Sequence, residues 1–279
     1  MTETPDPWLR RIAEALERLA PEPPEPPAFA EARLFHYDPH RDAFMGAPDY
    51  GLPLDLLVGV DRQKDRFVQN LTRFAKALPA NHALLWGSRG AGKSSMAKAA
   101  FMAVGAAYPN LRMVELDRDE VGALPALFEK LRGAAQRFVV LCDDLSFEEG
   151  AAAAKTLKSA LEGGVAGPPD NVLFVATSNR RHLMPRVHDE HRGPIASAED
   201  AEEEVSVSDR FGLWIGFPPM DQDAYLEAVR AYAKRFDLTV PDLDRRALQW
   251  SQLRGARSGR VAWQFTRDLA GELGRPLPL

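Results

Sequence analysis

Residues 87–94 read Gly-Ser-Arg-Gly-Ala-Gly-Lys-Ser, and this stretch decides the fold that we expect. It fits the pattern G-x-x-x-x-G-K-[ST] at every position. Glycines let such a loop curl so that its backbone N–H groups point at phosphate oxygens, in front of a helix N-terminus. The lysine can reach the β- and γ-phosphates, and the final hydroxyl can ligate Mg²⁺. The candidate nucleotide-binding residues here are Gly87, Ser88, Arg89, Gly90, Ala91, Gly92, Lys93, Ser94 and Ser95.

The neighbouring segments have the pattern that such a loop requires. An apolar strand is predicted over residues 82–86, and an alanine-rich helix over 93–104. This context makes a chance glycine-rich loop a poor alternative. Further apolar strands alternate with helices along the chain, which predicts a parallel sheet covered on both faces. Those strands are expected at residues 111–116, 138–142, 172–177 and 213–217.

The rest of the chain suggests two additional units. After residue 219 the strands stop, and helical periodicity predicts a small all-α lid domain over residues 220–279. At the other end, residues 8–19 have amphipathic helical spacing, followed by the polyproline-like linker PEPPEPP at 21–27. That helix is either a docking arm or, as we favour, an appendage that packs on its own domain. Residues 28–56 show little periodicity and are predicted to be irregular. The α/β domain would then span residues 28–219, with residues 1–27 as helix and linker.

Composition excludes several classes of protein. The chain has 279 residues, 45% of them hydrophobic and 27% charged, as in a folded protein. No apolar run approaches the roughly 20 residues of a membrane helix, and the N-terminus lacks a secretory signal pattern. A single cysteine, Cys142, fits a reducing cytoplasm, where we expect the protein. The net charge of −5 gives no sign of nucleic-acid binding, although a local basic patch can exist beneath it.

Two aspartates follow the apolar strand at 138–142. Ligands of open α/β sheets lie at the carboxyl ends of the strands. Asp143 is therefore expected to hold the Mg²⁺ shell together with Ser94, and Asp144 to orient or deprotonate an attacking water. The alternative for either acid is an N-cap of the next helix. Aspartate is one methylene shorter than glutamate, so hydrolysis at Asp144 is expected to be slow or to need a shifted water.

A polar side chain is also expected at the end of the next strand. Asn179 is the candidate for a hydrogen bond to the γ-phosphate or the attacking water, with Thr177 as the second choice. The alternative is that residues 177–179 only cap or turn the chain.

Two arginines are candidates for sensing or stabilising the phosphates. Arg210 precedes the last strand, where it can act on the nucleotide of a neighbouring subunit in a ring or spiral. An ion pair with Asp209 or another nearby acid is the alternative. Arg260 opens the last helix and can sense the γ-phosphate as the domains close, with Arg257 a weaker candidate. Either of these two can instead be solvated.

Together these segments resemble the AAA+ ATPases, over about residues 52–275. Residues 57–63, Leu-Val-Gly-Val-Asp-Arg-Gln, resemble the part of that superfamily that walls the adenine, which makes Val58 and Gly59 candidate base contacts. The sequence resembles the bacterial domain of unknown function 815 family more closely still, in the segments LLWGSRGAGKSS, DDLSF, ATSNRRHLMP and SDRFGLWIGF. The resemblance implies the P-loop NTPase (AAA+) fold, ATP and Mg²⁺ as cofactors, ATPase activity and homo-oligomeric assembly. It brings no established cellular role.

The remaining motifs narrow the type of AAA+ protein. The loop at residues 117–120 is acidic and lacks an aromatic residue, which disfavours a polypeptide-threading unfoldase. The short lid is more like those of replication initiators, helicase loaders and Holliday-junction motors, by analogy of fold alone. The histidines at 182, 188 and 191 favour a solvated loop over a metal site. Residues 199–204 favour an exposed acidic helix over a latch for a partner.

The leading hypothesis is an ATP-hydrolysing AAA+ protein that assembles through Arg210 and remodels a partner protein or nucleic acid. The second is a P-loop kinase for a small molecule, which would need an arginine-rich lid between strands that we do not find. The third is an assembly module that binds ATP without hydrolysing it, and the short Asp144 keeps this hypothesis open.

Overall fold

The computed structural model describes residue 8 and residues 29–146, 151–162, 167–179 and 209–277. The described residues form a seven-stranded sheet in the order β2-β1-β4-β5-β6-β3-β7. Every neighbouring pair is parallel except β1 and β2. The strands are β1 (Leu34–Asp38), β2 (Ala43–Ala47), β3 (Ala83–Gly87), β4 (Leu111–Leu116), β5 (Arg137–Cys142), β6 (Val172–Ser178) and β7 (Leu213–Phe217).

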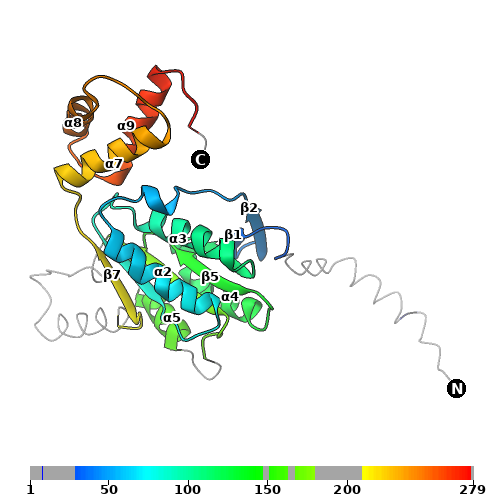
Figure 1. Ribbon diagram of the computed structural model, residues 1–279. Helices are drawn as coiled ribbons and strands as arrows, with labels where there is room; N and C mark the ends of the chain where they lie inside the picture. Colours follow the sequence, from blue (N-terminus) through cyan, green and yellow to red (C-terminus); the bar gives the residue numbers. More distant parts are fainter. Residues whose placement is uncertain (1–7, 9–28, 147–150, 163–166, 180–208, 278–279) are drawn as a thin grey trace, which may run out of the picture.

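Helices cover both faces of this sheet (Figure 1). On one face lie α2 (Asp61–Ala75) and α3 (Lys93–Ala107), and on the other α4 (Leu124–Leu131) and α5 (Ala151–Glu162). The strands between them are apolar on both sides. In β5, for example, Val139 and Leu141 face the first pair of helices, whereas Val140 and Cys142 face the second. This double burial explains the uninterrupted apolar strands of the sequence.

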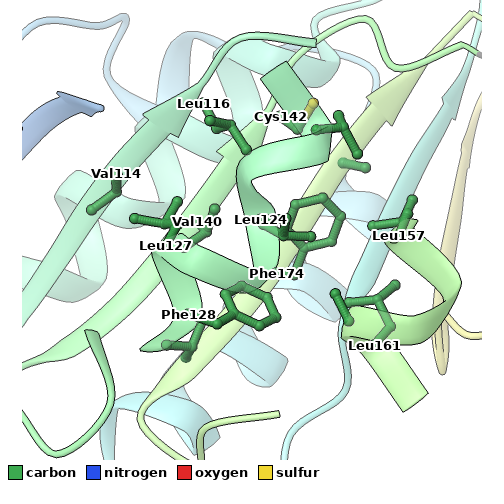
Figure 2. Packing of buried hydrophobic residues seen from close by; sticks show 14 of the residues in the cluster. Val114, Leu116, Leu124, Leu127, Phe128, Val140, Cys142, Leu157, Leu161 and Phe174 are labelled. Carbon is green, nitrogen blue, oxygen red and sulfur yellow. The ribbon is translucent and has the colours of Figure 1, made fainter. Parts of the chain in front are cut away.

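Figure 2 shows the second of these layers, where leucines and a phenylalanine of α4 and α5 pack on β4, β5 and β6. Cys142 is part of this core. Burial raises the pKa of its thiol to about 12, and the charge of Asp143 adds to the effect. The thiol therefore stays protonated and serves as a small apolar side chain.

The N-terminal part of the described chain differs from the prediction. Residues 28–56 were expected to be irregular, but they contain the β1–β2 hairpin and the short 3₁₀ helix η1 (Leu54–Leu56). Phe35 and Tyr37 alternate into the core, and the Asp38 carboxylate accepts the N–H groups of His40 and Arg41 to form the turn. The prediction failed because this alternation covers only five residues and the partner strand, Ala-Phe-Met-Gly-Ala, has no β-branched residue.

The last three helices pack around a core of their own. They are α7 (Gln222–Arg235), α8 (Leu243–Leu253) and α9 (Gly259–Glu272), here called the lid helices. Tyr225 is fully buried among them, and its hydroxyl donates to the Ala247 carbonyl at 3.0 Å. Leu56 of η1 joins this core, so the segment before α2 ties the lid helices to the sheet. None of the described helices has the length and apolar character needed to cross a membrane.

Candidate functional site

The loop at residues 87–94 connects β3 to α3, and its backbone requires glycine at two close approaches. Gly87 has φ +136°, and a Cβ on it would lie 2.1 Å from the Phe217 carbonyl oxygen of β7. Gly90 has φ +76°, and a Cβ there would lie 2.9 Å from the Ser258 hydroxyl at the start of α9. Both conformations are in the region that L side chains rarely adopt. The loop is therefore fixed between the sheet and the lid helices.

Helix α3 begins at Lys93 without a capping side chain, because its N-cap is Gly92. The first N–H groups of a helix need an acceptor, and an anion is favoured there by the helix dipole. Lys93 is 6% exposed, and its ammonium group donates to the carbonyls of Gly87 and Ser88, each at 2.9 Å, and to Asn179 Oδ1 at 3.0 Å. The start of α3, which has no capping side chain, thus lies beside a cation that is held in place.

Burial lowers the pKa of Lys93 below its ordinary value. Asp143 and Asp144 oppose this shift, whereas Arg260 adds to it. Arg89 and Arg260 line the same pocket as the lysine, and so do Asp143 and Asp144. The pocket therefore offers cations for an anionic group and carboxylates for a metal ion.

Asp143 receives two hydroxyl donors. The Ser94 hydroxyl donates to its carboxylate, and the Thr177 hydroxyl donates to Oδ1 at 2.5 Å. These three side chains come from α3, β5 and β6, and the parallel pairing of β5 with β6 places the two strand ends together. A carboxylate and two hydroxyls are oxygen ligands of the kind that Mg²⁺ prefers. The donor set therefore fits the metal that the loop motif implies.

Asp144 is held differently from its neighbour. Its backbone has φ +54°, and its N–H donates to the Thr177 hydroxyl at 3.0 Å. Asn179 Nδ2 donates to one carboxylate oxygen, and Arg118 Nη1 contacts the other at 3.3 Å. Asp144 is half-exposed, so these contacts are with a solvent-facing carboxylate. The sequence did not identify Arg118, although it follows β4, the strand beside β5.

Residues from the sheet and the lid helices line one pocket of about 380 Å³. Arg260 and Trp263 of α9 and Tyr232 of α7 form its lid side, and Leu52 and Leu57 form an apolar wall. Trp263 meets Tyr232 edge-on, with ring centroids 5.5 Å apart. The pocket therefore has a charged end at the loop and an apolar, aromatic end.

Most of the candidate residues line this pocket, and a few do not. Gly87, Ser88 and Ala91 shape the loop but are not part of the lining. Val58 packs against the core of the lid helices, and Gly59 lies beside Ala224 of α7. In this segment it is their neighbour Leu57 that lines the apolar wall of the pocket. The candidates in the lining are Arg89, Gly90, Gly92, Lys93, Ser94, Ser95, Asp143, Asp144, Asn179 and Arg260.

Arg210 lies away from the pocket of its own chain. Its guanidinium forms an ion pair with Glu162 at the end of α5. This contact is the kind of ion pair that the sequence left as an alternative, and a role on a neighbouring subunit stays a prediction. The histidine loop at residues 182–191, the acidic residues 199–204 and most of the N-terminal helix lie outside the described residues. Within the described ranges, no group of three or more His, Cys, Asp or Glu side chains could hold a metal ion.

The sequence profile of a protein family described as "Protein of unknown function (DUF815)" matches residues 30–273. The chain belongs to the DUF815 family. No curated protein shows a significant sequence match to it.

Solved structures show which fold the family member adopts. The Orc1 protein of Aeropyrum pernix, in a complex with DNA, aligns with a TM-score of 0.56 and 16% identity over 81% of this chain and 61% of that one. The P216G mutant of RuvB from Thermotoga maritima aligns with a TM-score of 0.55 and 17% identity over 82% and 68%. The chain thus spans about three fifths of the Orc1 structure. These likenesses confirm the AAA+ P-loop NTPase fold, with a mostly parallel sheet and a small helical C-terminal part.

Proposed function

We propose that this DUF815 protein binds and hydrolyses ATP and couples the cycle to assembly and to remodelling of a partner macromolecule. One observation carries the proposal: the uncapped start of α3, the buried Lys93 and the Ser94–Asp143 pair share a single pocket. In this proposal, residues 28–219 form the nucleotide-binding domain and residues 220–279 its lid.

The charged end of the pocket would take the triphosphate. Lys93 would contact the β- and γ-phosphates, while the N–H groups of the loop would donate hydrogen bonds to the phosphate oxygens. Ser94 and Asp143 would hold Mg²⁺, with Thr177 keeping the Asp143 carboxylate oriented. When bound, the metal would neutralise part of the negative charge of the triphosphate.

Asp144 and Asn179 are the candidates for handling the attacking water. Asn179 donates to Asp144 and accepts from Lys93, so one amide connects the carboxylate to the lysine. Asp144 would take the proton of the water as it attacks the γ-phosphorus in line with the leaving oxygen. Because Arg118 now occupies the other oxygen of Asp144, that contact has to loosen before the carboxylate is a free base.

The apolar end of the pocket would hold the nucleotide base. Leu52 and Leu57 give one wall, and Tyr232 and Trp263 give an aromatic surface from the lid helices. Flat purine rings gain from such apolar and aromatic contacts. A nucleotide in this position would touch the sheet and the lid helices at once.

That double contact supplies a route for coupling. Arg260 is exposed and lines the pocket, where it would meet the γ-phosphate, while Gly90 and Gly259 bring the loop and the start of α9 together. Loss of the γ-phosphate would therefore remove a contact that favours the closed lid. In an assembly, Arg210 of one subunit would complete the site of the next.

A binding titration with a fluorescent ATP analogue, with and without Mg²⁺, tests the proposal first. Energy transfer from Trp263 should accompany binding, and Trp263→Phe should reduce it while leaving binding within a few-fold. Phosphate release without any acceptor then tests hydrolysis. Absence of magnesium-dependent binding by the wild-type chain would reject the proposal, and turnover that requires an added acceptor would favour a kinase.

A second function is supported by the state of Asp144. Both of its oxygens are engaged, and its backbone is left-handed, so the chain can also be an assembly module that binds ATP without turning it over. The two functions differ in one measurement. If Lys93→Ala abolishes assembly and Asp144→Asn changes neither assembly nor phosphate release, the non-hydrolysing function holds.

A further inference from the structure

The outer face of α2 carries a line of cations. Arg62, Arg66, Gln69, Arg73 and Lys76 are all exposed and follow one another at intervals of three or four residues. This spacing places them on one side of the helix, over about 21 Å at 1.5 Å per residue. We call these five residues the basic stripe. Figure 1 shows α2 on the outside of the sheet beside α3, where such a face is open to solvent.

The opposite side of α2 is fixed to the fold. Phe67, Leu71 and Phe74 are buried against the sheet and α3. Gln63 donates to the Gly216 carbonyl of β7 at 2.9 Å, and Asn70 exchanges hydrogen bonds of 2.9 and 3.1 Å with the backbone of Asn81. The stripe is therefore a rigid surface.

The four cations have no ion-pair or hydrogen-bond partner among the described residues. In the lid helices some cations are paired, as Arg230 is with Asp244, whereas others such as Arg235 and Arg267 are exposed and scattered over two helices and do not form a row. On α2 itself, Asp61 is used by Lys64 at 2.6 Å. Asp65 is exposed three residues after Arg62 and beside Arg66, so it offsets part of their charge, and the remaining positive charge of the stripe faces solvent.

Helix stability alone does not account for the arrangement. Arg73 and Lys76 lie near the C-terminus of α2, where the helix dipole favours cations. Arg62 lies in the first turn, where the dipole disfavours them, and its spacing of four from Arg66 adds like-charge repulsion. Two of the four cations therefore work against the helix that carries them.

We propose that the basic stripe binds the phosphate backbone of a polynucleotide. The stripe contains only arginine, lysine and glutamine, all hydrogen-bond donors, and has no apolar residue in it. Protein interfaces have an apolar centre, whereas nucleic-acid interfaces are polar and positively charged. The two strands of a duplex carry closely spaced phosphates, so several of them lie within reach of a stripe of this length. The contacts would read no base sequence, because they reach only the backbone.

This inference goes beyond the proposed function, because binding at α2 requires no nucleotide. Only its effect on turnover rests on the ATPase proposal. α2 leads into β3 through the Asn70–Asn81 contact, and β3 ends in the loop that holds Lys93. A polynucleotide on the stripe would therefore stimulate phosphate release. Its binding would be transmitted from α2 through β3 to the loop at residues 87–94.

Fluorescence anisotropy of the full chain with a labelled DNA duplex of about 30 base pairs, at several salt concentrations, tests the proposal. The variant carries Arg62→Gln, Arg66→Gln and Arg73→Gln. A matched control removes the same charge from exposed cations of the lid helices by Lys234→Gln, Arg235→Gln and Arg267→Gln. Loss of three phosphate contacts should weaken binding about tenfold or more and make the slope of log K against log salt shallower by about 3, whereas the control keeps the wild-type slope.

Further variants separate misfolding and loss of ATP binding from loss of the stripe. The charge-conserving set Arg62→Lys, Arg66→Lys and Arg73→Lys should retain the wild-type slope. Lys93→Ala should still bind the duplex, and the triple glutamine variant should still bind ATP. Absence of duplex binding by an ATP-binding wild-type chain, equal slopes for wild type and triple variant, or binding of poly-glutamate but not of duplex would each overturn the proposal.

Discussion

The two neighbouring aspartates at the end of β5 differ in how they are held. Asp143 receives hydroxyl donors from a helix and a strand, Ser94 on α3 and Thr177 on β6. Asp144 is half-exposed and left-handed in its backbone, and it is held by Arg118 at the start of the 3₁₀ helix η2 (Arg118–Ala123) and by Asn179 just after β6. The contacts of Asp143 are partly buried, whereas those of Asp144 are exposed, so in the proposed site the part that would hold the metal is more firmly held than the part that would hold the water. Binding and turnover should therefore respond to different substitutions.

The sharpest test of this difference is Asp144→Asn. An amide cannot take a proton from water, so phosphate release should fall about a hundredfold or more. ATP binding should stay within a few-fold, because Lys93, Ser94 and Asp143 are unchanged. Single-turnover phosphate release and a separate binding titration measure the two quantities. Equal losses in both would show that the two aspartates act as one unit.

Lys93→Ala tests the part of the proposed site that would bind the phosphates. Removing the cation leaves the carbonyls of Gly87 and Ser88 without their donor and the triphosphate without its main charge partner. Binding of the ATP analogue should weaken by about a hundredfold, in line with a charged hydrogen-bond partner worth roughly 3 kcal/mol. Equilibrium titration checks this value. Tight binding by the variant would mean that the loop amides alone hold the nucleotide.

Acid should lower the stability of the sheet that carries both aspartates, through protonation of His82. His82 precedes β3, and its Nδ1 accepts the N–H of Phe174 on β6 at 3.0 Å. Burial lowers its pKa from 6.5 to about 4. Above pH 6.5 the imidazole is neutral in both states, so it contributes no pH dependence. Between pH 6.5 and 4, His82 binds a proton in the unfolded chain but not in the folded chain. Its titration therefore lowers the free energy of unfolding by up to about 3 kcal/mol, and His82 adds no further loss below pH 4.

Urea unfolding at pH 7 and pH 5 measures this effect. His82→Gln keeps a side-chain acceptor and does not titrate, so the variant should lose less stability than the wild type between the two pH values. The expected difference is about 2 kcal/mol, from 1.36 kcal/mol per pH unit. Parallel pH dependences in the two chains would show that His82 is not the group responsible.

Gly90→Ala tests the contact between the loop and the lid helices. The new methyl would lie 2.9 Å from the Ser258 hydroxyl, and alanine disfavours the φ of +76° at this position. We expect about a tenfold loss of ATP binding together with turnover, since the loop and α9 must move apart. Gly133→Ala is a matched control, because Gly133 has a similar φ of +74° and nothing lies within 4 Å of a Cβ there. Unchanged binding in Gly90→Ala would mean that the loop adjusts freely.

The smallest effect is expected for Arg118→Ala. The Arg118–Asp144 contact is exposed, so it contributes little to stability. Its removal frees one carboxylate oxygen of the candidate base, and phosphate release should rise about two- to threefold at unchanged ATP affinity. A fall in turnover would instead assign Arg118 a direct part in positioning the water.

The sequence predicted the parts of the fold that depend on local pattern. The strands at 111–116 and 213–217 have the predicted bounds, because each is a short, mostly apolar segment between turns or loops. The prediction of the loop at 87–94 rested on its glycine spacing, and the structure brings Lys93, Asp143 and Asn179 together. These residues meet because parallel strands end at one edge of the sheet.

Contacts that depend on the packing of distant elements were missed. Arg118 reaches Asp144 only because β4 is the neighbour of β5, an order that periodicity does not reveal. Tyr232 of α7 and Trp263 of α9 each fit the apolar pattern of their own helix, so in the sequence they resemble ordinary core residues. Only the packing of α7 and α9 beside the loop shows that both residues line the pocket. The hairpin of β1 and β2 was missed for a related reason, since five residues of alternation are too few to distinguish a strand.

The close fit of Gly90 and Gly259 against each other has a consequence for the timing of a catalytic cycle. In the proposed ATPase cycle, ADP would lie beside this contact, and its release would be easier after α9 and the other lid helices have moved away from the loop. Release of ADP, and not cleavage of the phosphoanhydride bond, should then be the rate-limiting step.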